Sequence, residues 1–266
     1  MLAFASNSLL CRMAMKETDI NAASYTSVRL LSGAAMLWFI MHWQNQAPMK
    51  HGSWRSALAL FIYAVALSYA YRSINTGAGA LVLFGAVQLT MLLAGYIAGE
   101  RLSRMQSLGF TAAMAGLAIL VSPSAAAPSI MDSILMLASG IAWGVYSIFG
   151  RNLQNPVAAT AGNFIRAAPL AICLSLFTLP WLQIDTRGII YALISGAITS
   201  GIGYVLWYRI LQHMSAMTAS TIQLSSPLLA ALGGVVLLGE ALTQELMIAS
   251  ILIIGGIWLV LRYRKK

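Results

Sequence analysis

Long apolar runs separated by short polar loops constrain this chain more than any other feature. One bilayer crossing takes about 20 apolar residues, so ten crossings would use most of the 266 residues. No run alternates as barrel strands do, and lipid leaves only helices and closed barrels to satisfy the backbone. The predicted spans are residues 1–15, 24–44, 54–71, 77–98, 105–122, 130–149, 157–179, 188–208, 214–238 and 245–261. We therefore predict an all-α integral membrane protein with ten transmembrane helices.

The composition excludes the soluble classes of protein. Apolar residues make up 59% and charged residues 9%, against roughly 25% charged in soluble domains. A soluble domain of this length needs a larger polar shell. The net charge of +9 fits basic loops against an anionic leaflet better than a nucleic-acid partner. The predicted partners are the lipid bilayer and a small-molecule substrate.

Lysine and arginine in the loops predict the orientation. With a cytoplasmic N-terminus, the inner loops and tail hold ten of these side chains, and the outer loops hold only Lys16, Arg72 and Arg187. The positive-inside rule favours this arrangement. An even number of spans places both termini in the cytoplasm. The predicted location is a bacterial inner membrane, crossed many times.

The chain repeats itself at a shift of 137–140 residues. The matches are Ser8 and Arg12 with Ser147 and Arg151, Arg29 with Arg166, Tyr71-Arg72 with Tyr208-Arg209, and Gly99-Glu100-Arg101-Leu102-Ser103 with Gly239-Glu240-Ala241-Leu242-Thr243. Each half, residues 1–125 and 126–266, holds five spans, so the second half enters the membrane upside down. We expect two inverted five-helix repeats, an architecture of secondary transporters.

These features resemble the drug/metabolite transporter superfamily. Each half ends its fourth span in Gly-Glu-x-Leu-[Ser/Thr] and looks like an EamA-type domain, and residues 225–230 fit the family's ninth helix. The aromatic content also resembles the YddG-like aromatic amino acid exporters. The resemblance implies a carrier that exports small metabolites, such as amino acids with aromatic or bulky apolar side chains, by alternating access. The rival interpretation is a channel or structural membrane subunit without a substrate cycle.

Two arginines fall inside spans, where a charge is costly and usually faces protein or a water-filled cavity. Arg29 and Arg166 either contact a substrate carboxylate or phosphate, or cap carbonyls and link helices, and we favour the structural interpretation. Arg12 lies nearer a span end and is expected to reach the surface. Glu100 and Glu240 follow the ends of their helices, where each is expected to pair with a basic or capping partner, as a gate or as a plain salt bridge.

Two prolines free backbone carbonyls within predicted helices. Pro227 frees the carbonyl of Gln223 and lies beside Ser226, and an interrupted helix at the midplane points to a binding site. Pro169 frees a carbonyl next to Arg166. Each proline is either a hinge or a static kink.

Aromatic and polar side chains on helix faces are candidates for the substrate site. Trp143 and Tyr146 share a face of one span, and Tyr204 lies on another. Asn7, Gln88, Ser226 and the Gln223 carbonyl offer neutral hydrogen bonds. The alternative for each aromatic is core packing.

Enzyme chemistry finds no support in the sequence. His42, His51 and His213 lie at span ends or in loops, and no P-loop is present, so we expect neither a metal nor a nucleotide cofactor. No acidic residue falls in the middle of a span. Because proton- and sodium-driven carriers usually embed a carboxylate, we predict transport that needs no proton gradient.

Overall fold

The computed structural model describes residues 1–47, 51–97, 99, 103–121, 129–150, 153–211 and 225–263, and within these ranges the chain is helical with no strand. The helices are α1 Leu2–Glu17, α2 Ala22–Trp43, α3 Trp54–Ala70, α4 Thr76–Ile97, α5 Arg104–Val121, α6 Ile130–Gly150, α7 Pro156–Phe177, η2 Leu179–Trp181, α8 Thr186–Leu193, η3 Ile194–Ile202, α9 Gly203–Leu211, α11 Ser225–Leu238 and α12 Gln244–Arg262. Every predicted span overlaps at least one of these helices, with ends that differ by a few residues in most spans. In the ninth predicted span, residues 214–238, the described helix begins at Ser225.

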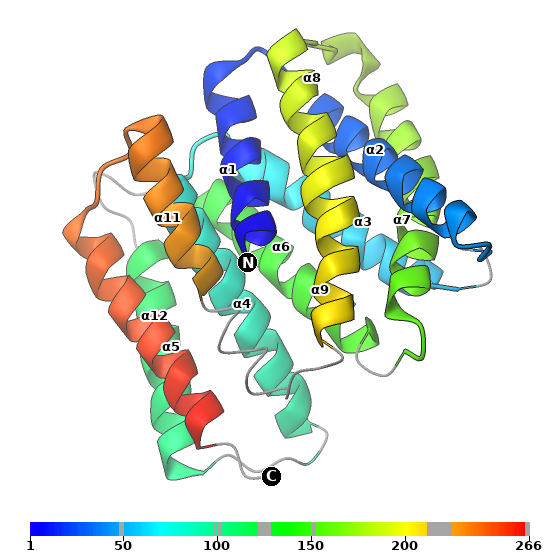
Figure 1. Ribbon diagram of the computed structural model, residues 1–266. Coiled ribbons are helices and arrows are strands. Elements are labelled where there is room, and N and C mark those ends of the chain that lie inside the picture. Colours follow the sequence, from blue (N-terminus) through cyan, green and yellow to red (C-terminus); the bar gives the residue numbers. More distant parts are fainter. Residues whose placement is uncertain are drawn as a thin grey trace.

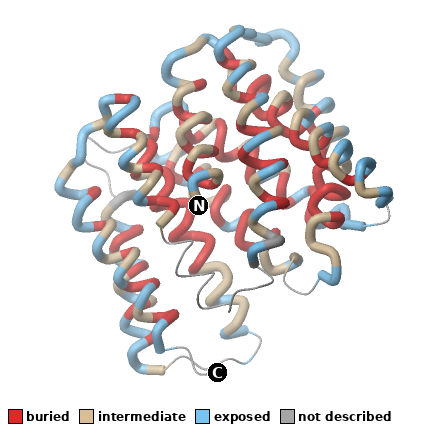
Figure 2. The backbone as a smooth tube through the Cα atoms, in the orientation of Figure 1, coloured by how far each residue is buried: buried red, intermediate tan, exposed pale blue. Residues whose placement is uncertain are grey.

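Five of the described helices are long and apolar enough to cross a membrane: α4, α6, α7, α12 and the continuous helix Thr186–Trp207. The helices α3 and α11 are apolar but shorter. Large apolar side chains on the periphery are exposed in the isolated chain, for example Trp43, Phe177 and Ile251. Buried residues lie toward the middle of the bundle (Figure 2). Exposed apolar side chains of this size suit a surface that faces lipid.

Side-chain caps explain where several helices begin. The capping residues are Asn21, Ser53, Asn155, Asp185 and Thr243, and the side-chain oxygen of each accepts a hydrogen bond from the backbone N–H three residues later. Such caps satisfy donors that have no partner within the helix. The polar residues that punctuate the apolar runs therefore set the starts of these helices.

The closest helix pairings join the two predicted halves of the chain. Helix α2 packs along α7, α3 and α4 both pack on α6, and α5 runs along α12 (Figure 1). Helix α1 packs against η3 and α11. The core therefore forms between the halves more than within either of them.

Two glycines allow neighbouring helices to approach closely. A side chain on Gly140 of α6 would overlap the Leu83 carbonyl of α4. A side chain on Gly196 of η3 would overlap the carbonyl of Arg29 on α2. Small residues at such interfaces are typical of membrane helix packing. The second contact places the backbone of η3 directly against the backbone at Arg29.

The segment η3 has the hydrogen-bond pattern of a π-helix, within the continuous helix from Thr186 to Leu211. A π-helix bonds residue i to residue i+5, and such segments are frequent at functional sites. This winding brings Ser195, Thr199 and Ser200 to one side of the helix, where all three hydroxyls reach Asn7 of α1.

Candidate functional site

Six buried aromatic side chains from five helices form one group, which we call the aromatic cluster. Its members are Phe4 of α1, Tyr63 of α3, Trp143 and Tyr146 of α6, Phe164 of α7 and Tyr204 of α9. Each is at most 8% exposed. Three members, Trp143, Tyr146 and Tyr204, are those that the sequence predicts for the substrate site, and the structure brings them together.

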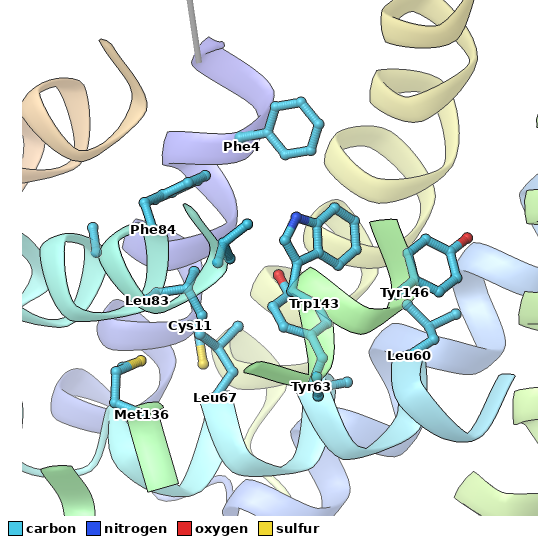
Figure 3. Close-up of a cluster of buried hydrophobic side chains, with 14 of the residues drawn as sticks. Phe4, Cys11, Leu60, Tyr63, Leu67, Leu83, Phe84, Met136, Trp143 and Tyr146 are labelled. Carbon is cyan, nitrogen blue, oxygen red and sulfur yellow. The ribbon is translucent and has the colours of Figure 1, made fainter. Parts of the chain in front are cut away.

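Trp143 is the centre of the aromatic cluster. Its ring centroid lies 4.8 Å from that of Tyr63, 5.2 Å from Tyr146, 5.4 Å from Tyr204 and 6.3 Å from Phe4. Figure 3 shows Phe4, Tyr63 and Tyr146 around the indole. These separations are those of offset-stacked and edge-to-face pairs, each worth about 0.5–1.5 kcal/mol beyond area burial. The rings close on one another here, so a ligand between them would have to part them.

Asn7 links the aromatic cluster to the π segment. Its Oδ1 accepts hydrogen bonds from Ser195 Oγ at 2.9 Å, from Ser200 Oγ at 3.3 Å and from the Thr199 hydroxyl. Its Nδ2 is buried and has no hydrogen-bond partner in the described part of the chain. Phe4 lies one turn earlier on α1, so this polar group adjoins the rings. The site therefore has an apolar side and a polar side.

Arg29 is a buried cation at the edge of the aromatic cluster, only 2% exposed. Its Nη2 donates to the Tyr63 hydroxyl at 3.1 Å, and its Cζ lies 5.2 Å from the centroid of the Tyr63 ring. Nη1 is buried without a hydrogen-bond partner among the described residues, and no carboxylate there forms an ion pair with Arg29. A buried charge without a counter-charge is costly. Arg29 thus differs from an arginine that only caps carbonyls.

A polar network closes the end of the bundle where α1 and α11 finish. Gly239 adopts a φ of +63°, and the N–H of Glu240 donates to the Gly234 carbonyl at 3.1 Å. This C-terminal turn brings the Glu240 carboxylate to α1 and α4. There it accepts from Arg12 Nε at 3.2 Å and from Thr76 N at 2.7 Å.

Arg12 extends this network to α3. Its Nη1 donates to the carbonyls of Tyr71 at 2.8 Å and Arg72 at 2.9 Å. The prediction that Arg12 reaches the surface is wrong: the residue is only 7% exposed, because Glu240 and two helix-end carbonyls hold it inside. A depression of about 740 Å³ opens beside the network, with Arg72 and Asp19 in its lining.

Arg166, the repeat counterpart of Arg29, has different surroundings. It is half-buried, and its Nη1 donates to the carbonyls of Gly162 at 3.0 Å and His51 at 2.6 Å. These are the contacts of a cap that ties α7 to the residues before α3. Pro169 is exposed, and α7 continues through it.

Several predicted site residues lie apart from the aromatic cluster. Gln88 is buried on α4 and makes no hydrogen bond within the described chain to a member of the cluster. Ser226 is buried in the first turn of α11 and donates to Met1 Sδ at 3.2 Å, with Pro227 next to it. Gln223 and Glu100 lie outside the described residues.

The sequence interpretation missed Phe4, Tyr63 and the three hydroxyls of η3. A signal for two of the hydroxyls is present, because Ser195 and Thr199 lie four residues apart in an apolar span, where polar groups turn toward neighbouring helices. The match of Arg12 with Arg151 in the repeat is a signal that Arg12 has a structural role.

Comparison with known proteins places the chain among transporters. The model of the EamA-like transporter family matches residues 1–122 and 131–262. An uncharacterized protein of Pseudomonas aeruginosa is 50% identical over 99% of this chain and 92% of its own length. An uncharacterized transporter of Archaeoglobus fulgidus is 28% identical over 78% of this chain and 77% of its own. A Salmonella typhimurium protein named as a probable amino-acid metabolite efflux pump is 26% identical, over 69% of this chain and 66% of its own.

A solved crystal structure shares the fold. It superposes with a TM-score of 0.66 at 19% identity and covers 97% of this chain and 96% of the other. The family resemblance that the sequence predicts is confirmed by the family match, which covers nearly all of both halves. The chain is a multi-pass membrane transporter, and it belongs to the EamA-like transporter family of the drug/metabolite transporter superfamily.

Proposed function

We propose that this transporter exports amino acids with aromatic or bulky apolar side chains, or similarly amphiphilic metabolites, across a bacterial inner membrane. The observation that carries the proposal is the aromatic cluster, built from five helices and bordered by polar groups of Asn7 and Arg29. An apolar ring packs on the indole of Trp143, and a polar end meets hydrogen-bond partners. The Salmonella typhimurium relative, which is named as a probable amino-acid metabolite efflux pump, agrees with this class. The aromatic content of the sequence, which resembles that of YddG-like exporters, is a second reason for it.

The layout that we propose is ten spans in two inverted five-helix repeats, residues 1–125 and 126–266. Matching the halves helix by helix relates α1 to α6, α3 to the α8–α9 helix, and α4 to α11. The contact of α3 with α6 then corresponds to that of α1 with η3, and the contact of α4 with α6 to that of α1 with α11. Helices α2 with α7 and α5 with α12 are self-matched pairs. This exchange pattern supports a two-fold relation between the halves.

The network of Arg12 and Glu240 is the proposed outer gate. It joins α1 and the α3–α4 turn of the first half to α11 of the second half. Lys16 adds a hydrogen bond from Nζ to the Leu238 carbonyl at 2.8 Å. Because these bonds tie the halves together at one end, they must break for the site to open there. Alternating access requires such a reversible closure.

Counterflow in proteoliposomes tests the proposed function. Vesicles loaded with unlabelled phenylalanine should accumulate labelled phenylalanine transiently, with a saturable rate. Ionophores that dissipate the pH gradient should leave this flux unchanged, since no span carries an acidic residue in its middle. A flux that does not saturate, or one that unlabelled substrate on the far side fails to accelerate, would favour a channel.

A further inference from the structure

We infer that the centre of this protein recognises a carboxylate through Arg29 and Asn7, so its substrates are aromatic carboxylates and need no amino group. This inference rests on the proposed function, because it assigns the charge of the molecule that enters the aromatic cluster. It reverses the structural interpretation of Arg29 that the sequence favours.

Arg29 and Asn7 each have a buried hydrogen-bond donor without a partner among the described residues. The polar atoms of Arg29 and Asn7 that are buried without a partner in the described chain are Arg29 Nη1 and Asn7 Nδ2, and both carry hydrogens. The Oδ1 of Asn7 accepts from the hydroxyls of Ser195 and Ser200, so its remaining free group in the described chain is the amide N–H. A buried donor left without an acceptor costs about 1–3 kcal/mol, and more when charged. The two side chains thus offer donors to a ligand that supplies acceptor oxygens.

The charge of Arg29 has no partner of opposite sign among the described residues. Arg29 is 2% exposed, and its guanidinium donates a hydrogen bond to the Tyr63 hydroxyl and lies beside the Tyr63 ring. Neither contact carries a full negative charge. Within the described ranges the one ion pair is that of Arg12 with Glu240, at the end of the bundle. A carboxylate on the ligand would supply the missing counter-charge, with a planar pair of oxygens that suits a guanidinium.

Arg29 and Asn7 lie beside the same aromatic rings. The Tyr63 ring that lies beside the Arg29 guanidinium packs on Trp143 at a centroid distance of 4.8 Å. On α1, Asn7 follows Phe4 by one turn, and Phe4 packs on Trp143. The two donors therefore border the same group of rings. If the aromatic ring of a substrate inserts between the rings of the cluster, a carboxylate a few bonds away from that ring can reach Arg29 and Asn7.

The charge of Arg29 decides between acid and amine. An ammonium group next to a buried guanidinium meets like charge, whereas a carboxylate meets opposite charge. An aromatic amine should therefore not bind, whereas an aromatic acid should bind at least as well as the amino acid with the same ring. Phenylpropionate, phenylalanine and phenylethylamine share one ring and differ in these groups.

The test measures how each compound, at increasing concentration, shifts the thermal unfolding midpoint of the purified full-length protein in detergent. Phenylpropionate and phenylalanine should raise the midpoint, and phenylethylamine should not. Arg29→Gln should weaken phenylpropionate binding at least about tenfold, the size of a lost hydrogen bond to a charged group. The matched control Arg166→Gln, in the counterpart helix, should keep the affinity of the unchanged protein.

The ligand-free variants give a second measurement. Arg29→Gln removes a buried charge without a counter-charge, so its midpoint should stay equal or rise, whereas loss of a purely structural arginine would lower it. Arg29→Lys keeps the cation but loses the planar fork, and should bind phenylpropionate with intermediate affinity.

The outcomes separate this inference from the proposed function. If phenylalanine shows counterflow but phenylethylamine stabilises as well as phenylpropionate, or Arg29→Gln binds the acid normally, the carboxylate site is refuted and the carrier stands. If none of the three compounds binds and phenylalanine shows no counterflow, both are refuted.

Discussion

The proposed outer gate predicts a measurable coupling between Arg12 and Glu240. Their side chains are 9% and 6% exposed, so the pair is nearly buried. Glu240→Gln removes the charge from two hydrogen bonds, one to Arg12 Nε and one to Thr76 N. Charge-assisted bonds of this kind contribute about 1.5–3 kcal/mol each, and breaking one partner of a buried pair costs about 3–5 kcal/mol. We therefore expect Glu240→Gln to lower the free energy of unfolding by about 3 kcal/mol.

A double-mutant cycle isolates the pair itself. Unfolding by sodium dodecyl sulfate in mixed micelles, followed by far-ultraviolet circular dichroism, gives the free energy for Arg12→Gln, Glu240→Gln and both together. The double variant should be less destabilised than the sum of the single variants by about 1.5–3 kcal/mol. Glu245→Gln is the control, because Glu245 is exposed in the first turn of α12 and should change stability by no more than about 0.5 kcal/mol. A coupling below about 0.5 kcal/mol would show that the closure does not depend on this pair.

Three further predictions concern the rings, the helix contact and the topology. Trp143→Ala should lower the rate of phenylalanine counterflow about tenfold, since it removes the centre of the aromatic cluster. The control Trp258→Ala changes a half-exposed tryptophan of α12 and should leave the rate unchanged. Equal rates for the two variants would mean that the rings serve only packing. Gly196→Ala should lower the free energy of unfolding by about 1–3 kcal/mol, seen as a lower thermal midpoint, because its methyl would overlap the Arg29 carbonyl. The control Gly255→Ala has nothing within 4 Å of the added methyl and should not lower the midpoint. A lower midpoint for Gly255→Ala than for Gly196→Ala would contradict the close contact. A cytoplasm-dependent reporter should be active after Lys266, and a periplasm-dependent reporter should be active between Pro123 and Pro128; the opposite result at either place would reverse the topology.

The helices were predictable from the sequence because their signals are local. An apolar run and the polar residue before it fix a helix and its start, as Asn21 and Thr243 show at α2 and α12. The family followed from a repeated motif at Gly99-Glu100 and Gly239-Glu240, which needs no knowledge of packing.

The site was only partly predictable because its partners are distant in sequence. Trp143 and Tyr146 share a helix face, so their pairing follows from spacing. Tyr63 joins them from α3, and nothing in its neighbourhood along the chain marks it out. Gln88 is as polar and as isolated as Asn7, yet only Asn7 faces three hydroxyls, because helix rotation depends on packing between helices.

The π winding of η3 explains the clearest gap. Regular α-helical spacing from Ser195 selects Thr199 but not Ser200, and a one-residue change in hydrogen-bond register adds the third hydroxyl. Periodicity counted at 3.6 residues per turn does not reveal such a change.

If the centre binds a carboxylate as inferred, Arg29 should make transport sensitive to voltage. With no counter-charge in the described part of the chain, the empty centre carries the positive charge of Arg29, and the inferred carboxylate would neutralise it. A charge that crosses the whole membrane field gains or loses about 2.3 kcal/mol per 100 mV, and a site whose access changes sides traverses part of that field. A potential that is negative inside would favour the empty centre facing the cytoplasm, while the loaded, neutral centre would turn outward without electrical opposition. The charge of Arg29 would therefore bias an otherwise reversible carrier toward export.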